Sequence, residues 1–205
     1  MKAEIPPEIA LNIQDRYETI TKLFESIVPD LTGINAWRYQ RSISSGIQEF
    51  IEAISFEHYL MHQTLITVFE AAAKLPDGIL LTSDDYLLGL FDLIGELMRF
   101  GITTIATSGS LPGSVQRLHG DKAESTDQGK RDIMMDLRIM RAAFESLDTN
   151  EYGGSGFGKT IQKKMEVMST CVEKVEMAVY GMVVRGRERP KGWVMDVREE
   201  RVETQ

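Results

Sequence analysis

The chain has few of the residues that build disulfides and soft-metal sites. Its 205 residues include one cysteine, Cys171, and three histidines. A single cysteine cannot form a disulfide within the chain, which is typical of a reducing compartment. It also excludes a cysteine-rich zinc site, and three histidines argue against an all-histidine metal site.

Long apolar runs are missing as well. No stretch approaches 18 uninterrupted apolar residues, the length that a membrane-spanning helix needs. The first ten residues, MKAEIPPEIA, lack the apolar core of a signal peptide. We therefore expect a cytoplasmic or nuclear protein, or one found in both places, with no membrane segment.

Basic residues are too scarce for a general nucleic-acid binder. Lys and Arg total 23 against 31 for Asp and Glu, so the formal net charge is -8. A freestanding protein that binds nucleic acid without specificity normally carries a basic surplus. The charge leaves open an enzyme that acts on nucleic acid, because catalytic metal sites are themselves acidic.

The alternating pattern of β-strands is nearly absent. Between the prolines, apolar residues recur every three or four positions, which is the period of a helix. This pattern predicts helices at about 8–27, 34–73, 82–106, 130–147 and 159–184. We expect an all-α fold, an antiparallel bundle with short connections, as a single domain over 1–205. The polar residues 186–205 are predicted to form a partly flexible tail.

The segment GGSGFGKT at 153–160 fits the phosphate-binding template GxxxxGK[ST]. That mechanism requires a strand before the loop, and the preceding sequence is predicted to be helix or turn. We therefore interpret the segment as a loop between helices, with Thr160 as the cap of the next helix.

His58 and His62 are four residues apart and share a helix face. The zinc motif HExxH is absent, so the pair is interpreted as an exposed or partner-facing flank. Cys171 lies in apolar helical sequence and is predicted to be a small buried hydrophobic residue.

Two predicted helices carry paired acids inside strongly apolar sequence. Glu49 and Glu52 are three residues apart, and Asp92 and Glu96 are four apart. Each pair shares one helix face. Acids in apolar helices are costly unless they are paired or bind a metal. If the two helices meet, the four carboxylates would need a hard cation such as Mg²⁺ or Mn²⁺ to offset their charge. The alternative is that each pair of acids lies on a solvent-exposed face of its own helix.

Three segments resemble the translin family. They are QEFIEAISFEHYL (48–60), DYLLGLFDLIGELMRFGITTI (85–105) and KVEMAVYGMVVRG (174–186). Within that family, the sequence is more similar to the paralogue with paired glutamates than to translin itself. The similarity covers about 9–197 and is weakest at 108–158.

The resemblance implies a seven-helix fold that assembles with translin into a closed hetero-octameric shell. It also implies an Mg²⁺-dependent endoribonuclease, with Mn²⁺ as an alternative ion, that is active only with its translin partner. The expected substrates are single-stranded RNAs. They include passenger-strand fragments in RNA interference and leader fragments in transfer-RNA processing.

The same resemblance assigns residues. The catalytic and metal-binding acids correspond to Glu49, Glu52, Asp92 and Glu96. We expect Glu49 and Asp92 to bind the metal most directly, with the other two acids completing the site. A non-catalytic scaffold subunit that binds translin and RNA is the alternative, and in it the four acids would be structural.

The expected RNA-binding residues are Arg38 and Arg41. Arg38 matches a basic position of the family's RNA-binding segment, which here reads Arg-Tyr-Gln-Arg, so that Arg41 adds a second charge. A surface salt bridge is the alternative role for Arg38. The chain is expected to lack the first family helix, because eight residues precede the segment that begins at Ile9. Residues 108–128 receive no assignment.

Overall fold

The computed structural model describes residues 6–113, 132–147 and 156–188. These residues contain six α-helices and one 3-10 helix, with no strand among them, which confirms the predicted all-α fold. None of the described helices combines the length and hydropathy needed to cross a membrane. The helices are α1 (Pro7–Ile27), η1 (Val28–Leu31), α2 (Ile34–His62), α3 (Val68–Ala72), α4 (Ser83–Ser108), α5 (Ile133–Glu145) and α6 (Gly156–Glu188).

The long predicted helix at 34–73 is divided in two. α2 ends where Gln63 adopts a left-handed conformation, with φ of 57°, and its N–H bonds to the Tyr59 carbonyl. α3 then starts from a capping box, in which the side chains of Thr67 and Glu70 each accept a hydrogen bond from the other residue's backbone N–H. Helix periodicity alone did not reveal this break.

α6 is longer than predicted at both ends. It begins at Gly156, so Thr160 lies inside the helix, and the prediction of a capping Thr160 is wrong. Partly buried Phe157 and buried Ile161 pack on the core, and this burial favours the early start. Residues 153–155 lie outside the described part. The first three residues of the predicted tail, 186–188, are helical, while 189–205 lie outside the described residues, so the tail stays a prediction.

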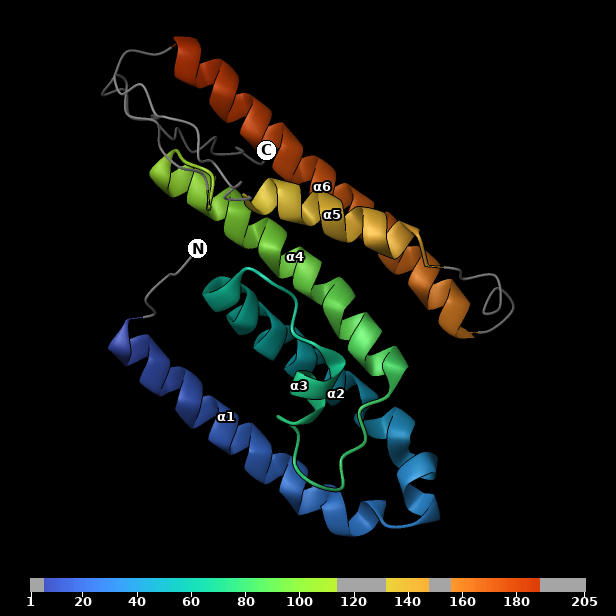
Figure 1. Ribbon diagram of the computed structural model, residues 1–205. Helices are drawn as coiled ribbons and strands as arrows, with labels where there is room; N and C mark the ends of the chain where they lie inside the picture. Colours follow the sequence, from blue (N-terminus) through green and yellow to red (C-terminus); the bar gives the residue numbers. More distant parts are fainter. Residues whose placement is uncertain (1–5, 114–131, 148–155, 189–205) are drawn as a thin grey trace, which may run out of the picture.

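The helices do not alternate in direction throughout. α2, α4 and α6 run one way, whereas α1 and α5 run the other way (Figure 1). Phe56 of α2 faces Phe100 of α4 with ring centroids 6.0 Å apart, and Asp85 at the start of α4 bonds to Ser44 early in α2. α2 and α4 are therefore parallel, in contrast to the expected antiparallel order. The connection that holds α3 returns the chain to the same end of the bundle.

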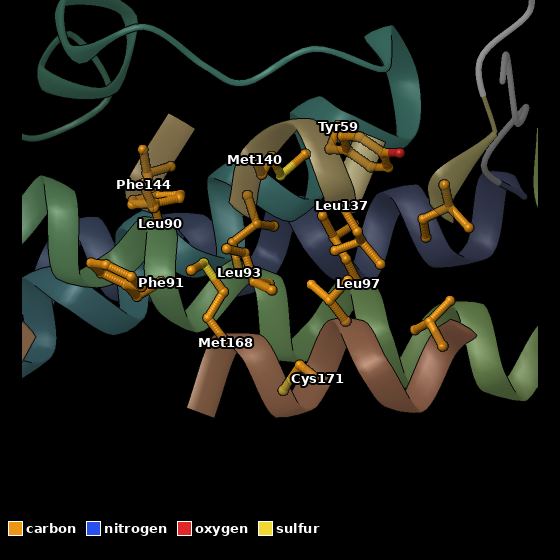
Figure 2. Close-up of a cluster of buried hydrophobic side chains, with 14 of the residues drawn as sticks. Tyr59, Leu90, Phe91, Leu93, Leu97, Leu137, Met140, Phe144, Met168 and Cys171 are labelled. Carbon is orange, nitrogen blue, oxygen red and sulfur yellow. The ribbon is translucent and has the colours of Figure 1, made fainter. Parts of the chain in front are cut away.

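Two apolar clusters meet at the α2–α4 contact. The first packs α4 between α5 and α6, with Leu93 and Leu97 at its centre (Figure 2). The second joins α1, η1 and α2 around Phe50 and Ile54. α2 belongs mainly to one cluster and α4 to the other, and their contact also brings together polar side chains from both helices, such as Ser44 and Asp85.

Candidate carboxylate site on helices α2 and α4

Gly89 sets how closely α2 and α4 approach. A β-carbon at this position would lie 2.8 Å from Cβ of Ile51 and 3.0 Å from the carbonyl oxygen of Gln48. A side chain at position 89 would push the helices apart. Gly89 is needed here for space, because its φ is not positive. The acids on the next turns of both helices are brought face to face.

Asp85 connects the same helices one turn earlier. It is 2% exposed, and its carboxylate accepts hydrogen bonds from the amides of Gln40 at 3.0 Å and Gln48 at 2.9 Å. The hydroxyl of Thr82 donates at 2.7 Å, and the hydroxyl of Ser44 also donates. Sequence reasoning missed this role. The sequence pattern that could have revealed it is the spacing of Gln40, Ser44 and Gln48, which are four residues apart and share one face of α2.

The four predicted acids gather around Glu52. The pKa of Glu52 is raised to about 7 by burial and by the negative charges of Asp92, Glu49 and Glu96. A hydrogen bond with the Glu96 side chain also raises it. Glu49 is exposed and the other three are half-buried. Glu52 is thus an acid whose pKa the other three raise.

Two cations balance part of this charge. Lys164 of α6 donates to Asp92, and Arg99 donates to Glu96 from one turn along α4. Sequence reasoning named neither residue. Arg99 could have been found from its spacing of three from Glu96. Lys164 could not, because only the packing of α6 on α4 brings it to Asp92.

Comparison with known proteins identifies the fold family. The sequence model of the translin family matches residues 2–186, which is most of the chain. The chain belongs to the translin family. The resemblance of the three quoted segments is thereby confirmed.

Individual relatives carry the name of one branch of this family. Translin-associated protein X of Rattus norvegicus is 25% identical over 214 residues, covering 93% of this chain and 66% of the relative. The homologue from Schizosaccharomyces pombe is 29% identical over 166 residues, covering 81% of this chain and 62% of the relative. Translin-associated protein X of Pongo abelii is 26% identical over 200 residues, covering 86% of this chain and 61% of the relative. The chain thus spans 61–66% of the length of these relatives.

The acids of this translin-family chain suit a hard divalent cation in their chemistry. Among the described residues, no group of three or more His, Cys, Asp or Glu side chains is placed closely enough to hold a metal ion. The donors nevertheless fit Mg²⁺ or Mn²⁺, which prefer carboxylate oxygens. Burial first, and then the charges of the three neighbouring acids, raise the pKa of Glu52 to about 7, and a bound cation would offset the charge part of this effect.

Both predicted RNA-binding arginines are exposed near the start of α2. Arg38 precedes Glu49 by eleven residues, and Arg41 precedes Glu52 by the same number. Eleven residues make close to three helical turns, so each arginine shares a face with an acid about 16 Å further along the helix. The guanidinium of Arg38 lies 5.7 Å from the centre of the Tyr39 ring.

A groove of about 580 Å³ separates α1 from α2 next to the acids. Its α2 wall includes Ser42, Ser45, Gly46 and Glu49, and its α1 wall is apolar apart from Ser26. The groove therefore extends along α2 from the arginine segment to the first of the four acids.

The remaining candidates lie apart from this site. The ring centroids of His58 and His62 lie 4.6 Å apart near the end of α2 with the rings tilted by 48°, and Nε2 of His58 is 3.1 Å from the Thr64 hydroxyl. Burial and the neighbouring His62 lower the pKa of His58. Cys171 is buried, as predicted, and burial raises the pKa of its thiol.

Proposed function

We propose that this chain is an Mg²⁺-dependent endoribonuclease subunit that cuts single-stranded RNA together with translin. The observation that supports the proposal is the arrangement of four carboxylates around Glu52, on two helices that a glycine and a buried aspartate hold together. Mn²⁺ is the alternative ion, because both ions favour oxygen ligands.

In this proposal Glu49, Glu52, Asp92 and Glu96 hold the cation. A bound Mg²⁺ supplies an activated water and offsets charge on the scissile phosphate. Lys164 touches Asp92 and places a positive charge beside the four acids, where it can attract a phosphate oxygen. Arg99 does the same beside Glu96.

RNA binding depends on a partner in this account. The net charge of -8 repels a polyanion, so Arg38 and Arg41 supply only part of the attraction. The relatives are named translin-associated, and we extend that partnership to this chain. Translin would supply the rest of the basic surface within a hetero-octameric shell. Passenger-strand and transfer-RNA leader fragments are the proposed substrates.

The test compares two acid variants in the complex of the full chain with translin. Glu49→Ala and Asp92→Ala should abolish cleavage of a labelled single-stranded RNA and leave assembly intact. Glu145→Ala is the control, because Glu145 is an exposed acid that pairs with Arg141 on α5. Cleavage that survives in both site variants would refute the nuclease proposal.

A second function has one observation in its favour. Lys164 and Arg99 already pair with Asp92 and Glu96, which suits a scaffold subunit whose acids are structural. A scaffold would bind translin and RNA without cutting. Titration with Mg²⁺ or Mn²⁺ separates the two functions, because the scaffold predicts no cation binding at these carboxylates.

A further inference from the structure

We propose that Trp37 stacks on a base of single-stranded RNA whose backbone follows the exposed face of α2 towards Glu49. This inference rests on the proposed function and deepens it, because it assigns a binding residue and a register to the RNA. Arg38 and Arg41 contact the phosphates of this RNA. Trp37 lies at the end of the RNA-binding surface that is farther from the four acids.

The first observation is the exposure of large apolar side chains at the start of α2. Trp37 is 77% exposed and Ile34 is 84% exposed, although burial of either would be favourable. Tyr39 is 41% exposed on the other side of Arg38. Trp37 and Tyr39 thus flank Arg38 in the sequence, and Arg41 follows two residues after Tyr39. Alternating aromatic and basic side chains are typical of surfaces that bind single-stranded nucleic acid.

The second observation is local charge. Residues 31–48 contain two arginines and no Asp or Glu, whereas the whole chain has 31 acids. On α2 itself an approaching phosphate meets only the two arginines, because the Asp85 carboxylate that packs against these turns is buried and held by neutral donors. The nearest acids in sequence are Asp30 before the segment and Glu49 after it. A polyanion is therefore attracted to this segment, and a cation bound at the acids would offset the repulsion that it meets further along the helix.

The third observation is the space beside the helix. The groove between α1 and α2 begins at Ser42, and the small side chains at positions 45 and 46 keep it open as far as Glu49. Its opposite wall carries Ile20 and Leu23, the latter 64% exposed. Apolar walls of this kind accept the faces of unpaired bases. A base-paired duplex would hide those faces, so the surface favours single strands.

Helix geometry sets the register. Trp37 precedes Glu49 by twelve residues, which is about 18 Å along the axis. At roughly 3.4 Å per stacked nucleotide, this distance spans about five nucleotides. The inferred cut therefore lies about five nucleotides from the base that stacks on Trp37.

Tryptophan fluorescence tests the stacking directly in the full chain. The sequence has two tryptophans, so the Trp193→Phe variant leaves Trp37 as the sole reporter. With divalent ions chelated, a 12-nucleotide single-stranded RNA should quench this fluorescence, and the matching duplex should not. Trp37→Ala should weaken binding roughly fivefold to a hundredfold, the usual effect of losing one stacked base.

Two variants serve as controls. Trp37→Phe keeps an aromatic face and should restore most of the affinity. Phe69→Ala removes an 84% exposed aromatic residue from α3 and should leave affinity unchanged. Thermal melting of each variant checks the fold, which the high exposure of both side chains should leave intact.

The outcomes separate this inference from the proposed function. RNA binding that is equal in the parent and in Trp37→Ala overturns the stacking and leaves the nuclease proposal standing. The absence of any RNA binding by the full chain overturns the inference, while the nuclease proposal is decided separately by cleavage in the complex with translin. A fluorescence change that follows protein concentration without RNA also overturns the inference, because Trp37 would then contact a second copy of the chain.

Discussion

Two carboxylate sites lie on the same pair of helices and have opposite surroundings. Asp85 is buried and accepts hydrogen bonds from neutral amides and hydroxyls of α2 and of its own helix cap. Glu52, two turns further along α2 than Ser44, is surrounded by three other acids and has a pKa of about 7.

The difference separates a structural carboxylate from one suited to bind a cation. Neutral donors satisfy a buried charge fully, and the result is a fixed contact between two helices. Like charges at close range leave an unfavourable energy that only a proton or a cation removes. The hydrogen bonds of Asp85 position α2 against α4. The acids around Glu52 lie close together because the two helices are held in this position. The predictions below test this contrast in order of decreasing effect.

The largest effect is expected at Asp85. Asp85→Ala removes the acceptor from Gln40, Ser44 and Gln48 and should lower the free energy of unfolding by about 3 kcal/mol. Asp85→Asn keeps one acceptor oxygen and should recover part of this loss. Urea denaturation measures both. A loss below 1 kcal/mol in Asp85→Ala would mean that Asp85 does not hold the helices together.

Gly89 should give the next largest effect. Gly89→Ala places a methyl group against Ile51 and the Gln48 carbonyl, and should cost about 1–3 kcal/mol. Gly95→Ala is the matched control on the same helix, because nothing lies within 4 Å of its added β-carbon. It should stabilise α4 by up to about 1 kcal/mol. Equal effects of the two changes in denaturation would contradict the close approach at Gly89.

Glu52 should give a smaller effect that depends on pH. Its pKa is about 7 in the folded chain and ordinarily 4.5, so between these values the unfolded chain loses the proton first. Glu52 therefore makes stability fall as pH rises from about 4.5 to 7, with no further loss above 7. Glu52→Gln should remove this fall and, after allowance for solvent screening, gain roughly 1 kcal/mol at pH 8.

Denaturation of the parent and of Glu52→Gln at pH 5 and pH 8, with divalent ions chelated, measures this difference. Glu145→Gln is the matched acid-to-amide control, because its carboxylate pairs with Arg141 away from the four acids, and the fall in stability caused by Glu52 should persist in it. Parallel pH profiles for the parent and Glu52→Gln would show that neither burial nor the neighbouring acids raise the pKa of Glu52.

The smallest effect is expected at Lys164. Its ammonium group pairs with Asp92 in a part-exposed contact and competes with any cation there. Lys164→Met should raise the affinity for Mn²⁺ about twofold to threefold, the size of a part-exposed ion pair. Lys163→Met removes an exposed neighbouring charge and should change affinity less. A loss of Mn²⁺ affinity in Lys164→Met would show that Lys164 supports the site instead.

Much of the fold could be predicted from helix periodicity and much of the site from acids in apolar sequence. Spacing places Glu49 with Glu52, and Asp92 with Glu96, on single helix faces. It does not show that α2 and α4 run parallel, because direction depends on the connection that holds α3. Nor does it show Lys164, since that contact depends on packing between helices far apart in sequence. The break at Gln63 requires a left-handed residue that is not glycine, which sequence patterns rarely indicate.

The central claim is that the acids around Glu52 form a divalent-cation site and that Asp85 does not. Calorimetric titration of Mn²⁺ into the full chain, into Glu52→Ala, Asp92→Ala and the folded control Asp85→Asn, tests it most directly. The account predicts one bound ion in the parent and in Asp85→Asn, with binding lost in the other two variants. Equal binding in all four proteins, or none in the parent, would contradict it.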